Sequence, residues 1–126
     1  IRDHNKEKFE TRKRLFAQCC DFLNAKYGEG TVLAEISDSY YNMKDALTDH
    51  MYLIDRACDA MRKIGVEPVI SPVRGGTDGC RLSYEGLPCP NLCTGGHNYH
   101  GKYEYVVTES MEKIVDLLVT IAGSWQ

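Results

Sequence analysis

The sequence predicts an α/β fold, and two observations support that prediction. From residue 46 onward, apolar residues recur first at helical spacing, then in short runs, then at helical spacing again. This order of helix, strand, loop, strand and helix is typical of an α/β domain. Residues 4–37 read as a separate helix and strand, joined to the rest through the polar and aromatic segment 38–45. The chain therefore has two parts, and the later part is the α/β one.

Three helices are predicted, over residues 4–27, 46–64 and 110–122. Each carries an apolar stripe at intervals of three or four residues, and we expect these stripes to face a core. Gly28 and Gly65 follow the first two stripes, and glycine commonly ends a helix. The stripe residues are Phe9, Phe16, Cys19, Cys20 and Leu23; Leu47, Met51, Ile54, Cys58 and Met61; and Met111, Ile114, Val115, Leu118 and Ile121.

Short apolar or alternating runs predict strands at residues 31–37, 68–73 and 89–94. Residues 103–107 are expected to be extended. A short helix is expected at residues 79–84, before a Gly-Leu-Pro turn.

Composition excludes several classes of protein. The chain has 126 residues, enough for a modest core, and a net charge of -3, whereas a nucleic-acid footprint would be strongly basic. No apolar run is long enough to span a membrane, and no signal-peptide pattern is present. The chain opens at Ile1 as if in the middle of a strand, so we expect a piece of a longer protein.

The six cysteines are predicted to be free thiols in a reducing compartment. Cys19, Cys20 and Cys58 fall on apolar helical stripes, where free cysteine behaves as a small hydrophobic residue.

Two glycine-rich stretches are the candidate functional motifs. The first is residues 74–79 (RGGTDG), which lacks the ending of a phosphate loop and the spacing of a dinucleotide fingerprint. It reads either as a tight turn capped by Thr77 or Asp78, or as a cradle of backbone donors beside the Arg74 cation, suited to a carboxylate or a peptide backbone. The sequence alone leaves both open.

The second stretch is residues 94–104 (TGGHNYHGKYE). Most single histidines lie at the surface or in a satisfied core, but glycines flank His100 and Glu104 follows at a spacing that could hold the loop. His100 is therefore a candidate metal ligand.

A closed zinc site of Cys89, Cys93, His97 and His100 is an alternative. However, only three residues separate Cys93 from His97, whereas such sites usually place roughly a dozen between their ligand pairs. We therefore do not favour it.

Arg2, before the first helix, could pair with an anion, although most such arginines are solvated.

These motifs resemble the peptidase T group of the dinuclear-zinc exopeptidases, which are tripeptide aminopeptidases. The resemblance runs nearly end to end and is most specific from residue 74 to residue 104. The matching stretches are residues 1–3 (IRD), 38–43 (DSYYNM), 74–79 (RGGTDG), 86–92 (GLPCPNL) and 94–104.

The resemblance implies a C-terminal part of a zinc-exopeptidase catalytic domain, at residues 44–126, preceded by the second half of an inserted α+β lid or dimerisation-type domain at residues 1–43. In this group two zinc ions are held by a histidine, a bridging aspartate, two further acidic residues and a C-terminal histidine, and the last of these matches His100. The lid arginine that meets the substrate carboxylate matches Arg2. The substrate-binding loop matches Arg74, Gly75, Gly76 and Thr77.

Some features of the group are not present in this sequence. No histidine heads a His-x-Asp motif, and the bridging aspartate and general-base glutamate of the group have no counterpart, so no residue here is assigned a catalytic role. Cys80, Cys93 and His97 stand where alanine, an aromatic residue and tyrosine are expected.

The leading hypothesis is a portion of a cytoplasmic tripeptide aminopeptidase that uses zinc-activated water and binds a tripeptide, with no nucleic-acid or membrane partner. A homodimer is left open. The alternatives are a related dipeptidase or acyl-amino-acid hydrolase, and a non-catalytic scaffold. The last is compatible with the first, because the longer protein can be an enzyme while this chain alone is inert.

Overall fold

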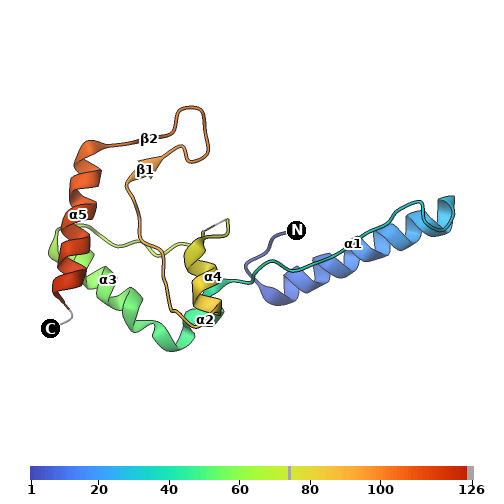
Figure 1. Cartoon of the computed structure of the whole chain (residues 1–126), viewed down its shortest axis with the longest axis horizontal. Helices are drawn as coiled ribbons and strands as arrows, with labels where there is room; N and C mark the ends of the chain where they lie inside the picture. The colour runs from blue at the N-terminus through green and yellow to red at the C-terminus, as the bar shows by residue number, and fades with distance from the viewer. Residues whose placement is uncertain (74, 125–126) are drawn as a thin grey trace. The chain divides into compact units, whose positions relative to one another are not determined.

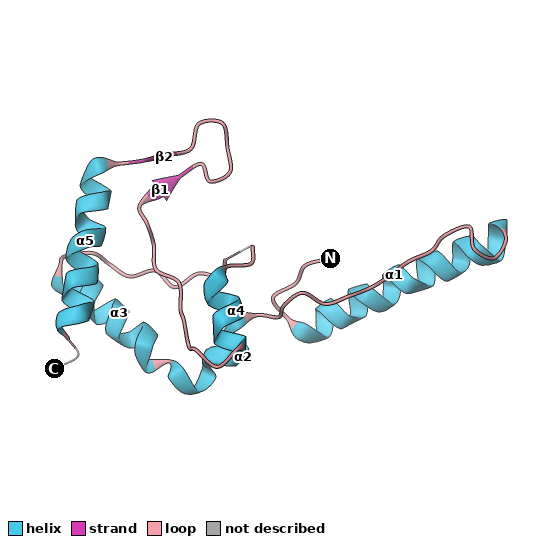
Figure 2. Cartoon of the chain, in the orientation of Figure 1, coloured by secondary structure: helices cyan, strands magenta, loops and turns pink. Residues whose placement is uncertain are grey.

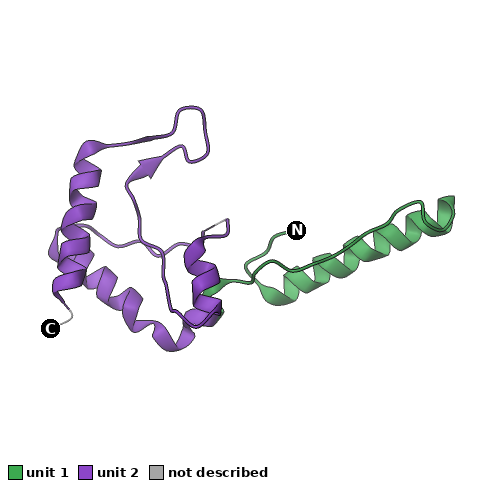
Figure 3. Cartoon of the chain, viewed as in Figure 1, with its two compact units in different colours: residues 1–45 green, residues 46–126 purple. Residues whose placement is uncertain are grey.

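The computed structural model describes residues 1–73 and 75–124. The chain divides into two compact units, Ile1–Asp45 and Ala46–Gln126 (Figure 3). The described residues are mainly helical, with a small two-stranded sheet in the second unit (Figure 2). In chain order the elements of Figure 1 are α1 (Lys6–Tyr27), α2 (Met43–Leu47), the 3₁₀ helix η1 (Thr48–His50), α3 (Tyr52–Lys63), α4 (Asp78–Tyr84), β1 (Gly96–His97), β2 (Tyr105–Val106) and α5 (Thr108–Gly123).

Helix α1 confirms the predicted first helix. Residues next to each end explain why the helix begins and ends where it does. The side chain of Asn5 accepts a hydrogen bond from the Lys8 backbone N–H at 2.9 Å, which satisfies a donor that the first turn leaves unpaired. The Asp3 carboxylate in turn accepts from the Asn5 N–H at 2.9 Å. Gly28 ends the helix at φ 110°, a conformation that costs little without a Cβ.

The segment after α1 returns along the helix, but the strand predicted at residues 31–37 is wrong. Alternating side chains indicate two faces, whereas a strand also needs a backbone ladder with a neighbour. Among the described residues, the Val32 backbone pairs with a side-chain amide instead. The Val32 N–H donates to Asn24 Oδ1 at 2.8 Å, and Asn24 Nδ2 donates to the Val32 carbonyl at 3.1 Å.

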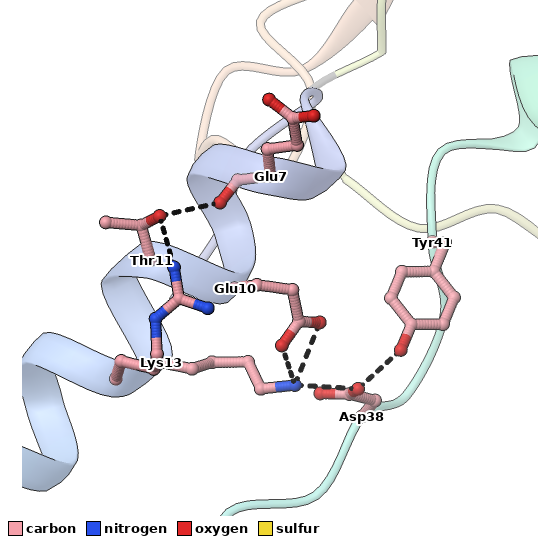
Figure 4. Close-up of polar contacts among 7 residues, drawn as sticks. Glu7, Glu10, Thr11, Lys13, Asp38 and Tyr41 are labelled. Carbon is pink, nitrogen blue, oxygen red and sulfur yellow. Dashed lines mark hydrogen bonds and ion pairs between the residues drawn. The ribbon is translucent and has the colours of Figure 1, made fainter.

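A cluster of charged and aromatic side chains also ties this segment to α1 (Figure 4). The Lys13 ammonium contacts Glu10 at 3.1 Å and Asp38 at 2.9 Å. The Tyr41 hydroxyl donates to the same Asp38 oxygen at 2.6 Å. Phe9 packs edge-on against Tyr41, with ring centroids 6.1 Å apart. Residues on two separate segments of the first unit therefore meet at Asp38.

These contacts alter the acid–base properties of the cluster. The Tyr41 hydroxyl and then the Lys13 ammonium hold the pKa of Asp38 below its ordinary value. The same bonds, with Asp38 first and Glu10 second, raise the pKa of Lys13. The bond to Asp38 also raises the pKa of Tyr41.

Most of the apolar stripe predicted on α1 is uncovered. Cys20 is buried, but Cys19 is exposed, as are Phe16 and Leu23. The expectation that this stripe faces a core is therefore wrong for the described residues, because the returning segment covers only part of the helix surface.

The single helix predicted at residues 46–64 is divided into α2, η1 and α3. Thr48 and Asp49 stand at the interruption, and such side chains compete for backbone hydrogen bonds, which makes them poor in a helix interior. The predicted stripe is confirmed in part, since Leu47 and Cys58 are buried and Ile54 and Met61 are half-buried, whereas Met51 is exposed.

The core of the second unit forms where α3 contacts α5. Ala57, Cys58 and Ala60 of α3 are buried, and small residues allow a close approach of two helices. Leu117 of α5 is 1% exposed. The inward stripe predicted on α5 is therefore only partly right. Ile114 and Ile121, at helical spacing from Leu117, are half-buried, whereas Met111, Val115 and Leu118 are exposed.

The strands predicted at residues 68–73 and 89–94 are also wrong. Both segments lack a ladder partner among the described residues, and Val69 and Ile70 are strongly exposed. The sheet consists instead of β1 and β2, paired antiparallel with His97 opposite Tyr105. The short helix expected at residues 79–84 is confirmed as α4, and β2 lies within the segment expected to be extended.

The Asp38 cluster gives a pH prediction. Because the folded pKa of Asp38 is lowered, its stabilising effect is complete above the unfolded pKa and is lost as the pH falls through the folded pKa. We expect NMR signals of residues 31–41 to shift in that acid range, and Asp38→Asn to shift them already at neutral pH. Asp59→Asn, which removes an exposed ion pair with Arg62 on α3, is the control. A carboxyl pKa of Asp38 at or above its ordinary value would contradict the cluster.

Candidate functional site

The first glycine-rich stretch leads into α4. Arg74 lies outside the described residues, while Gly75 and Gly76 are exposed. Thr77 is the N-cap of α4, and its hydroxyl oxygen accepts from the Cys80 N–H at 3.2 Å. The capped turn that the sequence allowed is therefore formed, and Thr77 rather than Asp78 is the cap.

Helix α4 is held against the segment that follows it. The buried Ser83 hydroxyl donates to the Gly79 carbonyl at 2.7 Å and accepts from the Cys89 N–H at 3.0 Å. A Cβ placed on Gly79 would lie 2.6 Å from the Cys89 carbonyl oxygen, closer than real Cβ contacts allow. Asn91 Nδ2 donates to the Thr77 hydroxyl oxygen at 3.1 Å. Thr77 and the first turn of α4 are thus tied to residues 89–91.

The sequence pattern indicates no role for Ser83 or for the side chain of Asn91. Thr77 and Asn91 are 14 residues apart, and they meet only because the chain reverses after α4. The Gly-Leu-Pro turn predicted this reversal, but no local pattern indicated which side chains would meet.

The second glycine-rich stretch forms the hairpin of β1 and β2. The His97 ring stacks on the Tyr105 ring across the sheet, with centroids 5.0 Å apart. Gly95 has φ 74°, and a Cβ there would lie 2.6 Å from the Ser110 Cβ on α5. The hairpin therefore starts in direct contact with the first turn of α5.

His100 lies in the turn of this hairpin, where its side chain is exposed. Asn98 and His100 adopt positive φ values of 55° and 62°, which are uncommon outside glycine. The His100 N–H donates to Glu104 Oε2 at 2.9 Å, and the Gly101 N–H donates to the Asn98 carbonyl at 2.9 Å. The expectation that Glu104 holds the loop is confirmed.

The residues that the structure describes do not form a complete metal centre. Over residues 1–73 and 75–124, no group of three or more His, Cys, Asp and Glu side chains could hold a metal ion. The closed zinc site of Cys89, Cys93, His97 and His100 is therefore not formed. His100 fits a metal in one respect, because its exposed imidazole sits on a turn whose backbone is already fixed.

Arg2 belongs to the first unit and is exposed. Its carbonyl accepts from the Arg12 guanidinium at 3.3 Å, and Arg12 also pairs with Asp3 at 3.2 Å. The backbone at Arg2 is therefore anchored to α1.

All six cysteines are free thiols, with Cys20, Cys58 and Cys80 buried.

The sequence profile of Peptidase family M20/M25/M40 matches residues 17–124, and the chain belongs to this family. It is 54% identical to Peptidase T of Alkaliphilus oremlandii (strain OhILAs) over 121 residues. It is 53% identical to Peptidase T of Halothermothrix orenii and 51% identical to Peptidase T of Caldanaerobacter subterraneus subsp. tengcongensis. Each alignment covers 96% of this chain, which spans about 30% of the length of these curated relatives.

No helix among the described residues is long and apolar enough to cross a membrane.

The contact at Gly79 gives a stability prediction. We expect Gly79→Ala to lower the free energy of unfolding by about 1–3 kcal/mol, the usual cost of overpacking, because Cys89 must move away. Gly75→Ala is the matched control, since a Cβ there meets nothing within 4 Å. Denaturant unfolding of both variants measures the difference, and equal stabilities would show that the approach of Cys89 to α4 is not tight.

Proposed function

We propose that the full-length protein carrying this sequence is a tripeptide aminopeptidase, which releases the N-terminal residue from tripeptides. The observation that supports this most strongly is the 54% identity to a Peptidase T over 96% of the chain. Similarity continues through both glycine-rich motifs, so it includes the residues that bear on the site. A related dipeptidase or acyl-amino-acid hydrolase is not favoured, because the relatives carry the name Peptidase T.

In this proposal the parts of the chain have separate tasks. Residues 44–126 are the closing part of the catalytic domain, and residues 1–43 are the second half of a lid domain. Arg2 and Arg74 hold the carboxylate end of the tripeptide, because a guanidinium binds a carboxylate with paired hydrogen bonds. Gly75, Gly76 and Thr77 offer donors beside it. The distance from these residues to the reacting bond would then select substrates by length.

Two zinc ions in the full-length enzyme are part of the same proposal. His100 would supply one imidazole ligand, and its partners would come from the part of the relatives' length that this chain does not span. Bound zinc can lower the pKa of a coordinated water to near neutrality. The Glu104 hydrogen bond to the His100 N–H would hold the backbone from which this imidazole projects.

Two further proposals concern location and assembly. We propose a cytoplasmic enzyme, consistent with six free thiols. A homodimer remains a proposal that size measurements of the full-length protein would decide.

The proposal predicts the effect of removing His100. In the full-length enzyme, His100→Ala should lower tripeptide hydrolysis by more than about a hundredfold, since losing only an outer-shell partner of a metal ligand already costs 10–100-fold. Release of the N-terminal residue from a simple tripeptide, with zinc added, is the measurement. His97→Tyr is the matched control, because it keeps a ring against Tyr105 on the same hairpin.

The isolated chain should cleave no tripeptide in the same assay. Turnover by the purified chain would show that the catalytic groups have been misplaced. Full activity of the His100→Ala enzyme would remove His100 from the site.

A further inference from the structure

We propose that, in the full-length protein, a β-sheet packs on the first unit and is completed by it. Residues 33–37 form one strand of that sheet, and the apolar side chains that α1 leaves exposed pack on its face. The other strands come from the first half of the lid domain, of which residues 1–43 are the second half. The identity of that segment rests on the proposed function, whereas the surface that receives it lies on described residues.

Residues 33–37 run back along α1 between two fixed points (Figure 1). Val32 is bound to Asn24 at one end of the segment, and Asp38 is bound to Lys13 at the other. Lys13 and Asn24 are eleven residues apart on the helix, which corresponds to about 16 Å along its axis. The six steps from Val32 to Asp38 span about 20 Å in a β-strand. The segment is therefore nearly as extended as a strand.

Both edges of this segment are open. Over residues 1–73 and 75–124, no backbone N–H or C=O group of residues 33–37 has a hydrogen-bond partner. An extended run with unpaired backbone groups is a template on which another strand can pair. Five residues are also an ordinary length for a strand. The segment thus has the length and the free backbone groups of a strand that lacks only its neighbour.

Helix α1 presents an apolar surface beside this segment. From residue 15 to residue 23 it has seven apolar residues and one charged residue, Asp21. Phe22 is 64% exposed and Leu15 is 60% exposed. An exposed apolar cluster of this kind marks an interaction surface. Five exposed residues at helical spacing form it, and they are called the uncovered face of α1: Leu15, Phe16, Cys19, Phe22 and Leu23.

A single sheet accounts for both observations. Phe16 and Leu23 are four and three residues from the buried Cys20, which in turn is four residues from Asn24, where the returning segment is bound. Residues at these spacings are neighbours on a helix surface, so the uncovered face adjoins the part of α1 beside the segment. Strands lie about 4.8 Å apart, and a helix with its side chains is about 10–12 Å wide. One or two strands added beside residues 33–37 would therefore lie under the uncovered face.

The sheet has to be a permanent part of the fold. Among residues 1–45, all of which the structure describes, Cys20 alone is buried. A unit of this size needs a larger core to be stable, so a partner that dissociates would leave it without one. This chain spans about 30% of the length of its relatives, so a full-length protein has further chain to supply the strands. These facts favour a segment of the same chain over a second copy.

Two measurements on the full-length protein test the proposal. Backbone amide exchange reports whether residues 33–37 are paired, at alternate residues at least, because a strand with one neighbour pairs every second N–H. Alkylation of Cys19 by iodoacetamide reports whether the uncovered face is covered, since this thiol is exposed in the structure described here. We expect both reactions to be at least about a hundredfold slower in the native protein than in the urea-unfolded protein, as for groups that react only after the fold opens.

A matched pair of variants tests the uncovered face separately. Leu23→Asp places a carboxylate on this face, whereas Ala25→Asp places one two residues further along, on a different side of the helix. Because a buried unpaired charge is costly, Leu23→Asp should quicken both reactions by at least about tenfold. Ala25→Asp should change neither. If Leu23→Asp does not fold, the two measurements on the unsubstituted protein still decide the question.

Exchange of residues 33–37 or alkylation of Cys19 at the rate of the unfolded protein would overturn the proposal. So would protection that disappears when the protein is diluted to monomers, because a second copy would then be the occupant. Neither measurement needs turnover. A protected but inactive full-length protein would refute the proposed function and keep the sheet, whereas an active enzyme with residues 33–37 unprotected would do the reverse.

Discussion

The approach of the Cys89 carbonyl to α4 is the constraint on which the candidate site depends. It leaves no room for a side chain at residue 79, and it brings the Cys89 N–H to the buried Ser83 hydroxyl. Only with the chain reversed in this way can the Asn91 amide reach Thr77. Among the glycines of the RGGTDG stretch, Gly79 is therefore the one that this approach requires. It is required because a side chain there would clash with Cys89, and not because its backbone adopts an unusual angle. The turn that leads into α4 is held in this way by Gly79, Ser83 and Asn91.

The hairpin that carries His100 is also fixed by contacts with neighbouring residues, although the contacts are of a different kind. Gly95 lets the chain pass against Ser110 at the start of α5, and the stacked rings of His97 and Tyr105 keep the two short strands together. The turn between them places two residues in the left-handed region, and Glu104 compensates for part of that cost by accepting from the His100 N–H. Both motifs thus rest on local contacts to neighbouring helices, while the hydrophobic core itself is small.

The features that the sequence predicted correctly are those that depend on residues close together in the chain. The cap at Thr77, the glycine stop of α1 and the Glu104 contact depend on residues a few positions apart, and each was predictable. The strands predicted at residues 31–37 and 68–73 are not formed, because an alternating or apolar run shows which side chains are apolar but does not identify a ladder partner. The exposure of apolar side chains such as Val69 and Met111 was also not predictable, because their spacing does not show which segment would cover them. The chain spans about 30% of its relatives' length, and we expect neighbours for these surfaces in the remainder. The bond between Asn91 and Thr77 required the three-dimensional structure.

We propose that this chain contributes one metal ligand and a substrate-binding turn to a site that other parts of a longer enzyme complete. Zinc binding tests it most directly, because a tight zinc site needs about three or four protein ligands. Equilibrium dialysis against zinc should find two tightly bound ions per full-length protein, fewer in its His100→Ala variant, and only weak binding to the isolated chain. Tight, stoichiometric zinc binding by the isolated chain, or an unchanged zinc content in the His100→Ala protein, would contradict the account.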